Sequence, residues 1–184
     1  MTGGKIFFDQ RDLGRRQSND LPKMTEKILS ENKISWNELD YIALTNGPGY
    51  FTGIRVGAAY ASGLAYASGT KIIPVSTLEM LAYEKKSEKI LTLIYAGHGF
   101  VYAEAKNFLE AGEYSHEFIK SWLEKNSDAE VISDDPERIE MNEIKISQVK
   151  PNLISLCRIA ENNFQRAVSP VDLKISYYRA PQGM

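Results

Sequence analysis

Few residues of this chain have the types and spacing that catalysis or metal binding requires. The only two histidines, His98 and His116, stand too far apart in the sequence to be paired metal ligands of one helix. His98 is predicted to lie in a hairpin turn, and His116 is expected as a surface residue at a helix start. The acidic residues within 134–137 could hold a cation, but such a run is more typical of a solvated loop. The sequence therefore predicts no catalytic residue and no metal site.

A glycine-rich turn, residues 46–49, joins an apolar strand to a helix, and Thr52 is the expected N-cap of that helix. The amides at such a helix start attract anions. However, Gly47, Gly49 and Gly53 are spaced too widely by one residue for the dinucleotide fingerprint, and no Gly-Lys-Ser or Gly-Lys-Thr ending follows. We interpret the segment as a structural turn, and the cofactor-binding residues stay unassigned.

The helix after this turn is rich in small residues. Its members Gly53, Gly57, Ala61 and Ala65 recur every four residues and so share one face. An internal glycine costs about 1 kcal/mol relative to alanine, and close packing against another backbone is the usual compensation. A membrane helix is not expected, because Arg55 is near the start and the apolar run is too short. The contact is either with the protein's own sheet or with a helix of another chain.

Composition limits the classes of partner and compartment. The 184 residues include 22 Lys and Arg against 24 Asp and Glu, so the net charge of -2 gives no overall drive toward nucleic acid. A local basic cluster at Arg11, Arg15 and Arg16 is typical of a solvated face. Cys157 is the only cysteine, which excludes an intrachain disulfide, and it is expected on a buried helix face where a thiol is inert. With no signal segment at the start and no long apolar stretch, we expect a cytosolic protein without membrane contact.

Hydrophobic periodicity predicts mixed strands and helices, which is typical of the α/β class. Capping boxes are expected at Ser35 with Glu38 and at Ser76 with Glu79. The polar residues 134–150 have no clear assignment, and residues 173–181 are expected to be extended. Strands are predicted at 5–10, 41–45, 71–75, 90–96, 100–106 and 130–133, and helices at 18–32, 53–65, 76–86, 115–125 and 153–164.

Two lobes are expected, residues 1–87 and 88–184, with the last helix packing back on the first lobe. The strand predicted at 5–10 follows a Gly3-Gly4 turn, so it reads as the second arm of a hairpin whose first arm is missing.

Several segments together resemble the TsaB (YeaZ) family. They are Asn-Gly-Pro-Gly-Tyr-Phe-Thr-Gly-Ile-Arg-Val-Gly at 46–57, Gly-Leu-Ala at 63–65, Pro-Val-Ser-Thr-Leu-Glu at 74–79, and the flanking segments 12–18 and 178–181. The resemblance implies an actin-like/Hsp70-like ATPase fold with ribonuclease H-like lobes, here lacking the first N-terminal strand. It also implies a cytosolic bacterial protein that is required for threonylcarbamoylation of the adenosine next to the anticodon in certain tRNAs.

The same resemblance implies a scaffold or activating subunit rather than an enzyme. In that family the catalytic paralogue is TsaD, which has a His-x-x-x-His metal site that this sequence lacks. The ATPase TsaE completes the assembly, tRNA is reached indirectly, and ATP or ADP is expected only in the complex. Docking onto TsaD, and self-association into a homodimer, are expected through one face of the first two helices. The expected interface residues are Leu21, Met24, Ile28, Gly53, Val56, Gly57, Tyr60, Ala61 and Leu64.

Two alternatives stay open. The chain could be an enzyme in its own right, either a nucleotide-dependent transferase or a peptidase, which would need an anion site at residues 47–53. Independent ATP hydrolysis is not expected, because residues 95–98 replace an Asp-Ala-Arg-type turn that is frequent in the family and lack its acidic residue. A tRNA-binding module is the other alternative, and the charge balance disfavours it.

Overall fold

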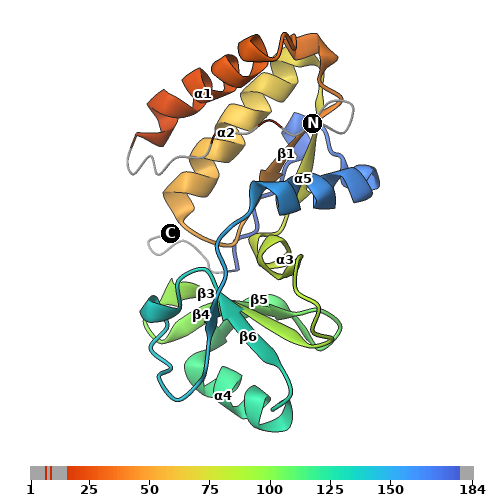
Figure 1. Cartoon of the computed structure of the whole chain (residues 1–184). Helices are drawn as coiled ribbons and strands as arrows, with labels where there is room; N and C mark the ends of the chain where they lie inside the picture. The colour runs from red at the N-terminus through yellow and green to blue at the C-terminus, as the bar shows by residue number, and fades with distance from the viewer. Residues whose placement is uncertain (1–6, 8, 10–15, 179–184) are drawn as a thin grey trace. The chain divides into compact units, whose positions relative to one another are not determined.

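The computed structural model describes residues 7, 9 and 16–178 (Figure 1). The strand predicted at 5–10 and the end of the tail therefore lie largely outside the described residues, as does the question of a missing first strand. The chain divides into two compact units. Unit 1 contains the described residues up to Asn46 together with Tyr50–Val75 and Leu156–Ile175, and unit 2 contains Gly47–Gly49, Ser76–Ser155 and the described residues from Ser176 onward. The expected lobes, 1–87 and 88–184, stay a prediction.

Unit 1 is built on a parallel strand pair connected by a long helix. Helix α1 (Gln17–Glu31) and a short 3-10 turn precede β1 (Tyr41–Thr45), and α2 (Phe51–Ser68) connects β1 to β2 (Lys71–Val75). Strands β1 and β2 pair in parallel along their full lengths. Helix α2 crosses over between them, which is the usual way to join parallel neighbours. These four elements match the predicted ones.

Later residues return to the same unit. The backbone of Val168 makes an antiparallel bridge to Ile72 of β2, with N···O distances of 2.9 and 2.8 Å. Helix α5 (Leu153–Asn162) contributes its residues from Leu156 onward to unit 1. Among these residues Ile159 and Ala160 are buried, while Cys157 is only half-buried, so the expected burial of that thiol is wrong.

The core of unit 1 depends on alanines of α2. Ala58, Ala61 and Ala65 are buried and pack with Leu44 of β1 and Ile72 of β2. Because an alanine side chain is a single methyl group, the helix backbone can approach the strands closely. The small residues of α2 are thus used in part against the protein's own sheet.

The helix starts in unit 1 agree only partly with those predicted from the sequence. The 3-10 turn (Trp36–Glu38) has the expected capping box, because the Glu38 carboxylate accepts from the Ser35 amide at 2.7 Å and from its hydroxyl at 2.6 Å. Thr52 is not the N-cap of α2, as the helix begins earlier, at Phe51, after an N-cap at Tyr50 without a side-chain bond.

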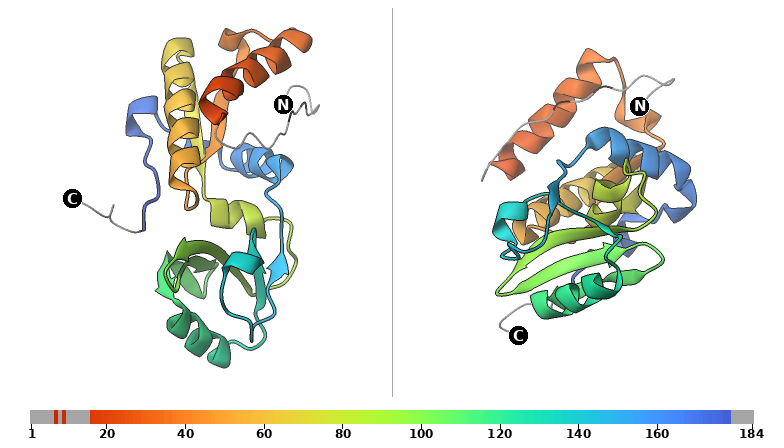
Figure 2. Two further views of the ribbon diagram at one scale, coloured as in Figure 1. Left: turned by 90° about the vertical axis from the view of Figure 1, so that its left-hand side faces the viewer. Right: turned by 60° about the horizontal axis from the view of Figure 1, so that its bottom comes forward.

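Unit 2 contains a five-stranded mixed sheet (Figure 2) with the order β5-β4-β3-β6-β7. The neighbours β3, β4 and β5 are antiparallel, whereas β6 is parallel to β3 and β7 is parallel to β6. The bounds are β3 Ile90–Gly97, β4 Phe100–Ala105, β5 Leu109–Ser115, β6 Glu130–Ser133 and β7 Ser147–Gln148.

The hairpin between β3 and β4 confirms the sequence prediction. Gly97, His98 and Gly99 all have positive φ, at 90°, 52° and 79°, which only glycine adopts without cost. Strand β5 was not predicted. Its residues include Gly112 and two glutamates, which are poor strand formers, and it forms because β4 provides a ladder for it.

Each face of the sheet in unit 2 has its own apolar layer. Leu91 and Leu93 of β3 pack with Ile119 of α4 (His116–Lys125) on one face. Ile94 points to the other face, where it meets Leu78 of α3 (Thr77–Ala82). This alternation follows from the two-residue period of a strand. Among the described residues no helix is long and apolar enough to span a membrane.

The second predicted capping box is wrong. Ser76 does precede α3, but its side chain caps nothing, and its buried hydroxyl has no partner among the described residues. The helix also ends at Ala82 instead of Lys86. By contrast, α4 begins where expected, because the Ser115 hydroxyl accepts from the Phe118 amide at 3.2 Å.

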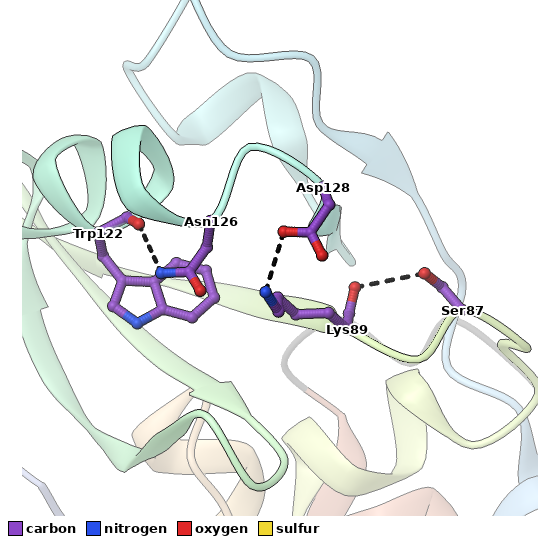
Figure 3. Close-up of polar contacts among 5 residues, drawn as sticks. All are labelled: Ser87, Lys89, Trp122, Asn126 and Asp128. Carbon is purple, nitrogen blue, oxygen red and sulfur yellow. Dashed lines mark hydrogen bonds and ion pairs between the residues drawn. The ribbon is translucent and has the colours of Figure 1, made fainter.

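Polar contacts attach the loop after α4 to the start of β3 (Figure 3). The Lys89 ammonium lies 2.9 Å from the Asp128 carboxylate, and the Lys89 carbonyl accepts from the Ser87 hydroxyl at 3.3 Å. The Asn126 side chain donates to the Trp122 carbonyl at 2.8 Å. The loop is therefore fixed at both of its ends.

Candidate functional site

The predicted interface residues all lie on α1 and α2 of unit 1, which contact each other. Near the first residues of both helices, a Cβ atom placed on Gly53 of α2 would be 3.9 Å from the side-chain nitrogen of Gln17 in α1. Ala61 differs from the others, because it is 5% exposed and belongs to the core of unit 1. The remaining predicted residues are half-buried. The helices thus bring the set together, with Ala61 turned toward the sheet.

Helix α1 presents a half-buried apolar strip. Leu21, Met24 and Ile28 are each partly exposed, and only Leu29 of this helix is buried. Lys27 and other polar residues occupy the opposite, exposed side. A strip with this spacing is amphipathic, and partial exposure leaves apolar surface available to another molecule.

The glycines of α2 are not closely packed within the described chain. A Cβ atom placed on Gly57 would meet no atom within 4 Å outside the helix's own backbone, and the same holds for Gly63. Of the two contacts that the sequence left open, the one with the protein's own sheet is made by the buried alanines and not by Gly57. The open space at Gly57 lies beside the half-buried Tyr60 and Leu64.

The glycine-rich turn before α2 is held by the protein's own backbone. In unit 1, the Asn46 amide donates to the Val75 carbonyl at 3.0 Å, and the Asn46 side chain donates to the Lys174 carbonyl at 3.1 Å. Gly47 and Gly49 have φ values of 106° and 151°, which require glycine. These contacts support the interpretation of a structural turn.

An exposed aromatic group at the start of α2 was missed by the sequence analysis. Tyr50 is 74% exposed and Phe51 is 42% exposed, and the Arg55 guanidinium carbon lies 3.6 Å from the centre of the Phe51 ring. The available signal was the placement of two aromatic residues inside a glycine-rich turn. Tyr66, near the other end of the helix, is 78% exposed.

The residues considered first for chemistry do not form a site. His98 occupies the hairpin turn, as predicted. His116 is half-buried and its Nε2 has no partner among the described residues, so the expected surface position is wrong. Burial raises the pKa of Asp134, which is therefore not a fully solvated carboxylate. Within the described part of the chain, no group of three His, Cys, Asp or Glu residues could hold a metal ion.

Comparison with known proteins decides the family. A family model described as TsaD, tRNA N6-adenosine threonylcarbamoyltransferase, matches residues 11–179. The tRNA threonylcarbamoyladenosine biosynthesis protein TsaB of Buchnera aphidicola subsp. Acyrthosiphon pisum is 30% identical over 156 residues, which cover 77% of this chain and 70% of that protein. The chain belongs to the TsaB (YeaZ) family. A second TsaB, from Haemophilus influenzae, is 42% identical over 59 residues, which cover 32% of this chain and 25% of that protein.

A solved structure extends the TsaB relationship to the fold. YeaZ from Pseudomonas aeruginosa has a TM-score of 0.68 and 20% identity, and the match covers 96% of this chain and 91% of that one. This likeness confirms the expected α/β fold of the actin-like/Hsp70-like class. The central motif at 46–57 was therefore a sound indicator of the TsaB family, although its Gly57 has no close neighbour among the described residues.

Proposed function

We propose that this TsaB-family chain acts in the biosynthesis of threonylcarbamoyladenosine in tRNA, as a non-catalytic subunit that binds a TsaD-like transferase. Its relatives are named as tRNA threonylcarbamoyladenosine biosynthesis proteins, and the proposal extends that role to this chain. It assigns the binding to one face of α1 and α2. We define the docking face as Leu21, Met24, Ile28, Gly53, Val56, Gly57, Tyr60 and Leu64.

The observation that carries the proposal is the open space at Gly57. A glycine inside a helix costs about 1 kcal/mol relative to alanine, and no contact with a described residue compensates for it there. The neighbouring docking face is apolar and only half-buried. A helix of another protein that packs against Gly57 would supply both the missing contact and the missing burial.

The non-catalytic assignment follows from the side chains that the sequence offers. A transferase built like TsaD requires a His-x-x-x-His pair, and the two histidines of this chain do not have that spacing. The subunit would then act by stabilising its catalytic partner. A TsaE-like ATPase and any ATP or ADP would join through the complex. A second copy of this chain would compete for the same docking face.

The decisive experiment is a Gly57→Leu variant. The first added carbon would meet no described atom within 4 Å, so the isolated chain should fold, while a partner helix would be held away from the docking face. We expect loss of co-purification with the TsaD-like partner and loss of tRNA threonylcarbamoylation in the reconstituted mixture. Ala61 is unsuitable for this test, because it is buried and a larger side chain there would disturb the core.

Ala59→Leu is the matched control. Ala59 is an exposed residue of the same helix, two residues after Gly57. Its side chain therefore points about 200° away from Gly57 around the helix and leaves the docking face free. This variant should bind the partner normally. Retained binding by Gly57→Leu, with a circular dichroism spectrum like that of the parent, would rule out the docking face.

A further inference from the structure

The start of α2 carries an aromatic and basic surface that the docking face does not include. It consists of Tyr50, Phe51 and Arg55, which we name the stacking surface. Tyr50 projects with 74% exposure, and the Arg55 guanidinium lies over the Phe51 ring with its carbon 3.6 Å from the ring centre. Two planar groups are thus layered at the surface of unit 1, next to an exposed phenol ring.

Arg16 lies at the same end of unit 1, on the side of α2 that Gly53 faces and therefore about 200° around the helix from Arg55. It directly precedes α1, whose first residue Gln17 lies close to Gly53 in the first turn of α2. In Figure 1 both helices begin at the lower left of the helix pair. The Arg16 side chain is 3.6 Å from the Asp20 carboxylate but remains 76% exposed, so this ion pair leaves most of the guanidinium in water.

The local charge at this end differs from the net charge of -2 of the whole chain. The sequence of α2, Phe51–Ser68, contains Arg55 and no acidic residue. Exposed aromatic rings beside arginines are the combination by which proteins hold single-stranded nucleic acid, because bases stack on the planes and arginines contact phosphates.

We propose that the stacking surface binds a single-stranded segment of RNA. An unpaired base would stack on Tyr50 or on the Arg55–Phe51 pair, and the Arg55 guanidinium would contact an adjacent phosphate. The inference rests on the proposed function, which places this chain beside a tRNA. It adds that the chain contacts the tRNA directly and not only through its partner. Fully paired RNA is a poorer ligand, because its bases stack on one another and cannot lie on Tyr50.

Fluorescence anisotropy with a labelled anticodon stem–loop RNA tests the proposal, using the isolated chain at low salt. Tyr50→Ala should weaken binding at least about fivefold, the loss expected for one base stack. Tyr66→Ala is the matched control, because Tyr66 is a tyrosine of the same helix with 78% exposure. It should leave the affinity unchanged, and a fully paired RNA should bind more weakly than the stem–loop.

The arginines are tested by salt dependence. Each phosphate neutralised on a single strand contributes about 0.7 to the slope of log affinity against log salt. Arg55→Gln should therefore reduce that slope by about 0.7. Arg16→Gln, on the Gly53 side of α2, should leave it nearly unchanged. Arg55→Lys should keep the slope and still lose affinity, because lysine has no planar group to stack on a base.

Three results would overturn the proposal. They are absence of salt-dependent RNA binding, equal effects of Tyr50→Ala and Tyr66→Ala, and a Tyr50→Ala variant that loses only the partner protein. The docking face is tested separately, because Gly57→Leu should leave RNA affinity unchanged. Loss of partner binding with intact RNA binding would count against the proposed docking alone, whereas the reverse result would count against the stacking surface alone.

Discussion

The Ser155 hydroxyl donates a 3.1 Å hydrogen bond to a carboxylate oxygen of Glu84, which lies just after α3. Ser155 is 1% exposed, so this bond satisfies a buried hydroxyl in the first turn of α5. The same oxygen accepts from the Asn152 side chain at 2.9 Å, and Asn152 in turn accepts from the Ile154 amide at 2.9 Å. Glu84 therefore holds the start of α5 through two bonds.

Glu84→Ala should lower the free energy of unfolding by about 1–3 kcal/mol, because the buried Ser155 hydroxyl loses its partner. Urea denaturation gives the measurement, and Glu88→Ala, at an exposed position nearby, is the control. The double variant with Ser155→Ala should recover part of the loss, since no buried polar group is then left unpaired. Equal midpoints for the Glu84 and Glu88 variants would show that the bond contributes nothing.

Two glycines of unit 1 should respond to alanine in opposite directions. Gly57→Ala should raise stability by about 0.5–1 kcal/mol, because the new methyl group meets no described atom within 4 Å and the helix gains propensity. Gly69 ends α2 with a φ of 70°, so Gly69→Ala should lower stability by about 1 kcal/mol. Thermal unfolding of both variants measures the difference. A destabilised Gly57→Ala protein would mean that the space beside this helix is occupied.

We expect Glu104 on β4 to make the stability of the protein depend on pH. Burial, and secondly the charge of Glu79, raise the pKa of Glu104, with Lys106 opposing them. The folded state therefore holds the proton more strongly than the unfolded state, and stability from this group is lost as pH rises through the raised pKa. Glu104→Gln should melt at a higher temperature than the parent at neutral pH, and the gap should close in acid.

Glu117 gives a control of opposite sign for that experiment. Hydrogen bonds from its own backbone amide and from Ser115 lower the pKa of Glu117. Its contribution is thus present at neutral pH and disappears as pH falls through the lowered pKa. Glu117→Gln should melt slightly lower than the parent at neutral pH. Parallel pH profiles for the Glu104 and Glu117 variants would contradict both assignments.

Local signals in the sequence predicted most of the elements and the family. Gly97 and Gly99 marked the hairpin because a tight turn with positive φ requires glycine, whatever surrounds it. The spacing of Leu21, Met24 and Ile28 marked α1 because helical periodicity is a property of the chain itself. The motif at 46–57 indicated the TsaB family for a similar reason, as its turn and helix start are adjacent in sequence.

Signals that depend on distant neighbours were misread. Ser76 has the sequence of a capping box, yet its hydroxyl is buried and α3 is short. Strand β5 contains Gly112 and two glutamates, which are poor strand formers, and it exists because β4 lies beside it. The polar segment 134–150 had no assignment, although Ile139 and Met141 within it are 3% and 1% exposed in the core of unit 2.

The sequence by itself determined the α/β class, the order of most elements, the TsaB family and the two helices of the proposed docking face. Only the tertiary structure decided which residues of that face pack in the protein's own core and which stay open to a partner. It turned Ala61 toward the strands, left Gly57 without a close neighbour among the described residues, and layered Arg55 on Phe51 at the start of α2. The physical reason is that a helix pattern fixes which residues share a side, whereas burial depends on which side the strands occupy, and those strands are formed elsewhere in the chain.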